Sequence, residues 1–161
     1  MANQLEKFGL RPYRKLDGTP LVGAQNRYII KSGYATAIYQ GDLVKPTSTG
    51  HIERHTANTS AAVVGVFNGV FYNDPTTQKP TFSNHYPGAI VASDIVANVI
   101  SDPDVIFEVK VDDANGGQAQ VGINANIATY GTGSTISGIS NVALNGGSFT
   151  TNNGANFRVV G

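Results

Sequence analysis

The chain has 161 residues and a formal net charge of zero, from 11 Lys and Arg against 11 Asp and Glu. It has no cysteine, which excludes disulfides, thiolate metal sites and a cysteine nucleophile. The first sixty residues hold eight of the bases but only four of the acids, and Arg158 is the one charged residue after Asp113. A self-contained soluble domain usually spreads charge over its whole surface, so this sorting predicts a protein that packs against other chains.

Residues 1–27 are predicted to form an extended N-terminal arm. Gly9 and Pro12 disfavour a helix there, and Asp17 followed by Gly18 is typical of a turn. Two interpretations stay open: an edge strand of the chain's own sheet, or an extended segment that docks on a neighbouring protein. The candidate interface side chains are the large and basic residues of the arm: Phe8, Leu10, Arg11, Tyr13, Arg14 and Lys15.

Residues 28–161 are predicted to form a single β-rich domain. Short runs of β-branched and aromatic residues are separated by Gly, Pro, Asn and Asp, which is typical of antiparallel strands. No longer window shows helical periodicity. The expected fold class is therefore all-β, a small antiparallel barrel or sandwich with the extended arm. The predicted strands cover residues 27–31, 37–40, 43–45, 63–67, 70–72, 89–100 and 105–111.

The strongest local signal is the pair Asn68 and Gly69, which lies between the apolar runs 63–67 and 70–72. Asn-Gly is favoured in two-residue hairpin turns because both positions must adopt positive φ. The sequence therefore predicts a β-hairpin over residues 63–72.

The final third, residues 114–161, is rich in Gly, Asn, Ser and Thr and almost without charge. Disordered segments are normally charged and lack regularly placed apolar residues, whereas apolar side chains recur through this one. Uncharged, glycine-punctuated strands slip in register unless a partner fixes them. We therefore expect this segment to be ordered in an assembly, with a last strand over residues 157–161.

One constellation has the spacing of a metal site. In a strand, His51, Glu53 and His55 would share a face and could converge on one transition-metal ion. The alternative, a solvated strand face, is favoured because Arg54 lies within the run. The sequence has neither a nucleophile elbow nor a phosphate-binding glycine loop with its lysine. We expect no enzymatic activity, no catalytic residue, no metal and no cofactor.

The basic half lacks the pattern of a nucleic-acid surface. Its Lys and Arg residues stand singly between apolar ones and the pI is about 6.8, whereas a phosphate-tracking surface needs a denser basic patch. No apolar run approaches the length of a membrane span, and the first residues lack the apolar core of a signal peptide. We therefore expect neither nucleic acid nor a membrane as partner.

Several segments occur in an order that carries a resemblance. They are residues 8–12 (Phe-Gly-Leu-Arg-Pro) with the turn at 17–18, 41–44 (Gly-Asp-Leu-Val), 65–72 (Gly-Val-Phe-Asn-Gly-Val-Phe-Tyr), 87–88 (Pro-Gly) and 102–112 (Asp-Pro-Asp-Val-Ile-Phe-Glu-Val-Lys-Val-Asp). In this order and spacing the chain resembles the capsid decoration (cement) proteins of podovirus-like tailed bacteriophages. Similar chains often continue past the last strand, whereas this sequence ends at Gly161.

The resemblance implies a structural virion protein that is made in the host cytoplasm and binds the capsid exterior. It would stabilise the shell by bridging neighbouring capsomers. Its partners would be the major capsid protein and other copies of itself, with which it would form a homotrimer. One alternative is a tail- or fibre-associated β-domain that binds a host glycan through exposed aromatics, with Tyr72, Tyr86 and Tyr130 as candidates. A second is a metal-dependent hydrolase built on the two histidines and the glutamate above.

Overall fold

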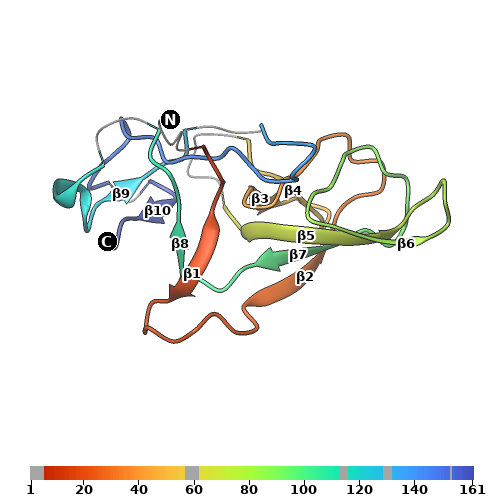
Figure 1. Ribbon diagram of the computed structural model, residues 1–161, viewed down its shortest axis with the longest axis horizontal. Helices are drawn as coiled ribbons and strands as arrows, with labels where there is room; N and C mark the ends of the chain where they lie inside the picture. Colours follow the sequence, from red (N-terminus) through yellow and green to blue (C-terminus); the bar gives the residue numbers. More distant parts are fainter. Residues whose placement is uncertain (1–5, 57–61, 113–115, 129–131, 153) are drawn as a thin grey trace, which may run out of the picture.

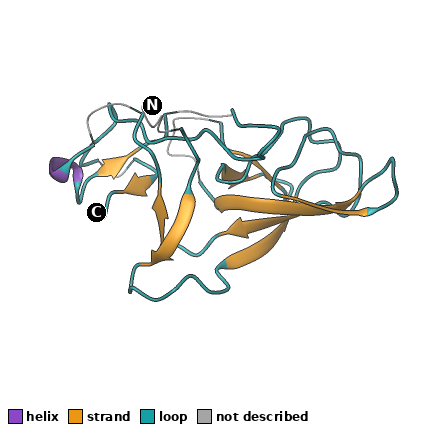
Figure 2. Cartoon of the chain, viewed as in Figure 1, coloured by secondary structure: helices purple, strands orange, loops and turns teal. Residues whose placement is uncertain are grey.

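The computed structural model describes residues 6–56, 62–112, 116–128, 132–152 and 154–161 (Figure 1). Strands and loops make up nearly all of it, and the helical part described is one 3-10 turn, η1 (Gln118–Gln120) (Figure 2). The predicted all-β antiparallel class is confirmed, and the described sheets are open and sandwich-like rather than closed into a barrel. The strands are β1 (Arg11–Lys15), β2 (Gln25–Ile29), β3 (Leu43–Pro46), β4 (Ile52–Arg54), β5 (Gly65–Asn73), β6 (Pro80–Ser83), β7 (Val96–Ile100), β8 (Val105–Glu108), β9 (Asn124–Ala125) and β10 (Phe157–Arg158).

The largest sheet is six-stranded and antiparallel, in the order β2-β7-β5-β3-β4, with β6 paired to the second half of β5. Two further sheets have two strands each, β1 with β8 and β9 with β10. In Figure 1 the β1–β8 pair lies to the left of β2, beside β9 and β10, and the long strand β5 extends to the right.

The inner face of the six-stranded sheet carries the main core. Phe67, Val70 and Val99 are completely buried there. The loops after β2 and β6 cover them with Ile38 and Tyr86, which form an isolated antiparallel bridge. Complete burial of an apolar side chain of this size contributes about 1.5–3 kcal/mol, so this face supplies much of the stability of the fold.

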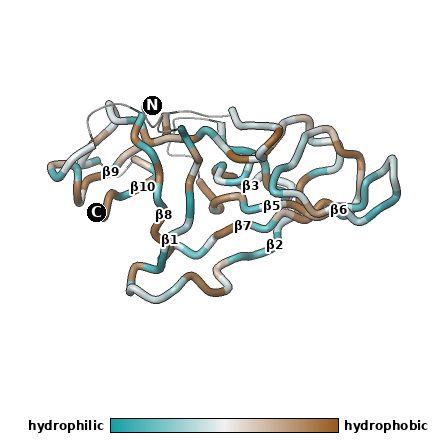
Figure 3. The backbone as a smooth tube through the Cα atoms, in the orientation of Figure 1, coloured by the Kyte–Doolittle hydropathy of each residue, from teal (hydrophilic) through white to brown (hydrophobic). Residues whose placement is uncertain are grey.

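A second apolar cluster joins the final third of the chain to the sheet. Leu10, Leu43 and Val66 pack there with Ile127 and Val142. In the part of the final third that the structure describes, the strands are short and isolated bridges take the place of long ladders, and in Figure 3 apolar and polar stretches alternate along it. Its recurrent apolar residues thus include core positions of the chain itself.

The predicted hairpin at Asn68 and Gly69 is wrong. β5 passes through both residues without reversing and pairs with β7 on either side of them. The register shifts between Phe67 and Gly69, so Asn68 is the extra residue of a β-bulge, and Gly69 has a φ of 138°. Because the bulge resets the two-residue alternation, Phe67 and Val70 both point into the main core.

A buried aspartate ties three parts of the fold together. Asp42 is 1% exposed, and its carboxylate accepts hydrogen bonds from the Ser140 hydroxyl and from the Tyr39 N–H, the latter at 2.9 Å. Its backbone carbonyl accepts from the Phe67 N–H of β5 at 2.8 Å. Burial raises the pKa of this carboxyl, and the two hydrogen bonds and the charge of Arg54 oppose the shift.

Candidate functional site

β1 is a strand of the chain's own fold, which agrees with the first of the two interpretations of the arm. β1 pairs antiparallel with β8, with Arg11 opposite Glu108 and Lys15 opposite Val105. This pair, called the ribbon below, forms a separate two-stranded sheet among the described strands. Docking of its exposed side chains on a neighbouring protein stays a prediction.

The residues just before β1 enter the core. Leu10 is 3% exposed, and its N–H donates to the Gly41 carbonyl at 3.0 Å. Gly9 has a φ of 71°, and a Cβ there would lie 3.1 Å from the Gly41 Cα, so only glycine permits this close approach without strain. Leu10, one of the six interface candidates, therefore serves the packing of its own chain.

Two arginines of the ribbon lie over aromatic rings. The guanidinium carbon of Arg11 is 4.8 Å from the ring centroid of Phe8, and that of Arg14 is 5.9 Å from the centroid of Tyr13. Such cation–π contacts contribute about 0.5–1 kcal/mol at exposed sites. Tyr13 and Leu16 are 61% and 60% exposed. The ribbon therefore presents apolar and basic side chains together to solvent.

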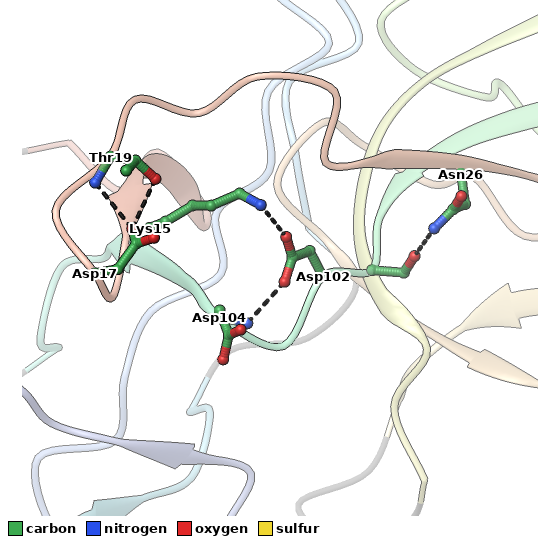
Figure 4. A network of polar contacts seen from close by, with 7 residues as sticks. Lys15, Asp17, Thr19, Asn26, Asp102 and Asp104 are labelled. Carbon is green, nitrogen blue, oxygen red and sulfur yellow. Dashed lines mark hydrogen bonds and ion pairs between the residues drawn. The ribbon is translucent and has the colours of Figure 1, made fainter.

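A polar network closes one end of the ribbon (Figure 4). The Lys15 ammonium lies 2.8 Å from the Asp102 carboxylate, which also accepts a hydrogen bond from the Asp104 N–H at 3.0 Å. In the turn after β1, the Asp17 carboxylate accepts from the Thr19 N–H and hydroxyl. The hydrogen bond and charge of Asp102 raise the pKa of Lys15, and Lys15 lowers the pKa of Asp102. Part of the charge sorted along the sequence is thus paired within the chain.

An apolar groove of about 920 Å³ opens beside the ribbon, and we call it the ribbon groove. Its walls are the ribbon, residues 63–66 and residues 156–161. Phe107, Val109 and Phe157 line it and are half-buried against the cluster around Leu10. The ribbon groove is therefore an accessible continuation of the second core cluster.

A second apolar surface lies on the outer face of the six-stranded sheet, opposite the main core. Ile29 of β2 is paired with Val96 of β7, Val96 with Phe71 of β5, and Phe71 with Phe82 of β6. These four side chains form one row, which we call the outer strip. Phe82 is 73% exposed and Ile29 is 42% exposed. Single exposed apolar residues are ordinary, whereas contiguous ones mark interaction sites.

The structure does not gather His51, Glu53 and His55 into a metal site. The Nδ1 atom of His51 lies 3.0 Å from the Thr49 hydroxyl, Glu53 forms an ion pair with Lys45 at 3.0 Å, and His55 is 2% exposed. Within the described ranges, no group of three His, Asp or Glu side chains could hold a metal ion.

Two of the three tyrosines expected to form a sugar platform, Tyr72 and Tyr86, are in the interior. Tyr72 is 5% exposed and Tyr86 is completely buried, with its hydroxyl donating to the Tyr34 carbonyl at 2.8 Å. Burial raises the pKa of both phenols. Tyr130, the third candidate, lies outside the described residues. Tyr72 and Tyr86 therefore cannot offer their rings to a glycan in this conformation.

Comparison with known proteins gives no relative: no family model, no curated protein and no solved structure matches the chain. In the described part of the chain, no helix is long and apolar enough to cross a membrane. The resemblance carried by the ordered segments therefore stays a prediction.

The sequence points to side chains of the ribbon, whose docking role stays a prediction, but to neither the ribbon groove nor the outer strip. The strip depends on the register of four strands, and the bulge at Asn68 determines which side chains of β5 share its face. The alternation of residues along one strand carries no information about register between strands, so the available signal was only the apolar character of each residue.

Proposed function

We propose that the chain is a structural virion protein that binds the outer surface of a phage capsid and stabilises it by bridging neighbouring capsomers. The observation that carries the proposal is the presence of two separate accessible apolar surfaces, the ribbon groove and the outer strip. A bridging protein needs at least two contact surfaces and no reactive group. The resemblance of the ordered segments to decoration proteins supports the same function.

The ribbon is the surface that we assign to the major capsid protein. It carries Arg11 and Arg14 beside exposed Tyr13 and Leu16, a composition suited to an acidic and partly apolar partner. Arginine and tyrosine are enriched among the residues that dominate protein interfaces. Each contact can be weak, because repetition on a lattice multiplies the affinity.

The test is to mix the purified protein with undecorated capsids and to count bound copies per capsomer. Saturation at a fixed lattice stoichiometry is expected. A few copies at a single vertex would instead indicate a tail-associated part, and no binding would overturn the proposal.

Point substitutions test the ribbon without removing β1, since deletion of residues 1–15 would also remove Leu10 from the core. We expect the double variant Tyr13→Ser, Arg14→Ser to reduce occupancy and Lys31→Ser, an exposed base outside the ribbon, to leave it unchanged. High salt should weaken attachment if the arginines contribute through charge. Unchanged occupancy of the double variant would exclude the ribbon as the capsid contact.

A further inference from the structure

Among the described strands, β8 is paired on one side only, by β1. Successive residues of an antiparallel strand direct their N–H and C=O groups to alternate sides. The Leu16 N–H donates to the Asp104 carbonyl at 2.7 Å, so in this register the even-numbered residues of β8 direct their backbone groups toward β1. The odd-numbered residues direct theirs to the opposite side. That side is the open outer edge of β8.

The open edge continues past the end of β8. The Leu144 N–H donates to the Lys110 carbonyl at 2.8 Å, and the Asp112 N–H donates to the Leu144 carbonyl at 2.9 Å. Leu144 thus takes over the side of the chain that β1 leaves, and the even-numbered positions stay bonded there. Phe107 and Val109 direct their N–H and C=O groups to the other side, where no described segment pairs with them.

The ribbon groove lies along this open edge. Every residue from 105 to 109 lines it, and residues 156–161 form a separate wall. In Figure 1, β1 lies on one side of β8 and the β9–β10 pair lies beyond the other side. Five residues of strand extend over about 16 Å. The groove is therefore bordered by a run of backbone long enough to pair with one short strand.

The side chains along the edge also suit a strand. Phe107 and Val109 are half-buried and pack with the cluster around Leu10. A strand added beside them would place every second side chain on the same apolar cluster and direct the others to solvent. An unpaired strand edge is a template for another chain. In such edge addition the backbone hydrogen bonds supply affinity, and the alternate side chains supply specificity.

The charges that line the groove favour neither sign. The charged lining residues are Arg14, Arg158, Asp102, Asp104 and Glu108. Asp102 is already paired with Lys15 of the ribbon, which leaves two bases and two acids. Because these charges balance, the groove suits a segment whose own side chains are uncharged.

We propose that the ribbon groove receives an extended, uncharged segment of the major capsid protein, which pairs with the outer edge of β8 as a third strand of the ribbon. The inference rests on the proposed function and names the part of the partner that this surface binds. The capsid protein is its source because the groove shares Tyr13, Arg14 and Leu16 with the surface of the ribbon that we assign to that protein. A protein docked on the ribbon therefore lies beside the groove.

The first test is hydrogen exchange of the full chain, free and bound to undecorated capsids. The N–H groups of Phe107 and Val109 should exchange rapidly in the free protein, because they have no partner among the described residues. Their exchange should slow about tenfold or more on the capsid, as it does for amides that become hydrogen-bonded in stable structure.

A pair of variants tests the backbone contact itself. Val109→Pro removes the outward N–H, while the bonds to β1 and to Leu144 involve other residues. Val109→Ala is the matched control, because it shortens the side chain and keeps the N–H. Capsid affinity should fall about tenfold further in the proline variant than in the alanine variant. The melting temperature shows whether both are folded, and exchange of the wild type decides if the proline variant is not.

The outcomes separate this inference from the proposed function. Capsid binding without slower exchange at the edge of β8, or equal affinity of two folded variants, would overturn the inference and leave the proposed function in place. Absence of capsid binding would overturn both. Slow exchange already present in the free protein would mean that the chain covers its own edge, and protection that grows with protein concentration would assign the edge to a second copy. Either of these results also overturns the inference.

Discussion

The six-stranded sheet and the final third of the chain are held together in different ways. The sheet has continuous ladders, such as β2 on β7 and β5 on β7, over a core of completely buried side chains. The final third instead uses side chains as hydrogen-bonding groups: the Ser148 hydroxyl accepts from the Asn126 N–H at 2.9 Å, and the Asn124 amide donates to the Asn152 carbonyl at 3.0 Å. Hydrogen bonds from polar, uncharged side chains there take the place of part of the backbone-to-backbone hydrogen bonding of a strand ladder.

This contrast explains the composition of residues 116–161 in physical terms. Irregular backbone leaves N–H and C=O groups that must be paired when they are buried, and Ser and Asn carry short groups that reach neighbouring backbone. Charge would be costly at such positions. The predictions below test whether the two regions depend on different interactions.

The largest effect is expected in the main core. Phe67→Ala removes a completely buried ring under the bulge and should lower the free energy of unfolding by about 3–5 kcal/mol. Urea unfolding measures this loss, with Ile136→Ala, whose side chain is 98% exposed, as a control that stays within about 0.5 kcal/mol. Equal losses in the two variants would mean that the sheet is not held by its inner face.

Asp42→Ala should have the next largest effect, and it should be local. The substitution leaves the Ser140 hydroxyl and Tyr39 N–H without their acceptor and should cost about 1–3 kcal/mol. Hydrogen exchange should increase more in residues 132–144 than in β7. Uniform exchange across both regions would contradict the role of Asp42 as a local anchor.

Asp42→Asn provides the matched variant. It keeps one oxygen acceptor and removes the buried charge, so its loss should be smaller than that of alanine. Because burial raises the pKa of Asp42 above 3.8, its ionisation lowers stability as pH rises through the raised pKa. The asparagine variant should lack that component of the pH dependence.

Ser148→Ala tests the smaller contacts of the final third. It removes the acceptor of the Asn126 N–H and the donor to the Asn145 carbonyl. The free energy of unfolding should fall by about 0.5–1.5 kcal/mol for each lost hydrogen bond. Ser48→Ala, in an exposed turn, should change the melting temperature little. If both variants behave alike, side-chain hydrogen bonds are not what holds this region.

The sequence predicted the fold class because alternation and turn residues are local signals. The prediction failed at Asn68 and Gly69, because the same dipeptide occurs in hairpin turns and in β-bulges. Only the pairing of β5 with β7 on both sides of these residues distinguishes the bulge from the hairpin. The role of Asp42 was equally hidden, since its partner Ser140 is far along the chain. The ribbon residues were found as apolar and basic side chains, but their pairing with β8 depends on tertiary contacts.

The smallest effect concerns the ion pair that joins the basic and acidic parts of the sequence. Lys15 lowers the pKa of Asp102 below 3.8, so the stabilisation is present above that value and is lost as pH falls through the lowered pKa. The raised pKa of Lys15 has the opposite sense: its contribution is present below 10.5 and is lost as pH rises through the raised value.

The variant Lys15→Met tests the acid side of this dependence. Its melting temperature should fall less than that of the wild type when the pH is lowered from about 5 to about 2, the range around the unperturbed pKa of an aspartate. Lys31→Met, an exposed base outside the ribbon, should retain the wild-type profile. Because both partners are solvent-accessible, added salt should reduce the difference between Lys15→Met and the wild type. A difference that persists in high salt would mean that packing of the lysine stem against the ribbon, rather than its charge, joins β1 to the turn before β8.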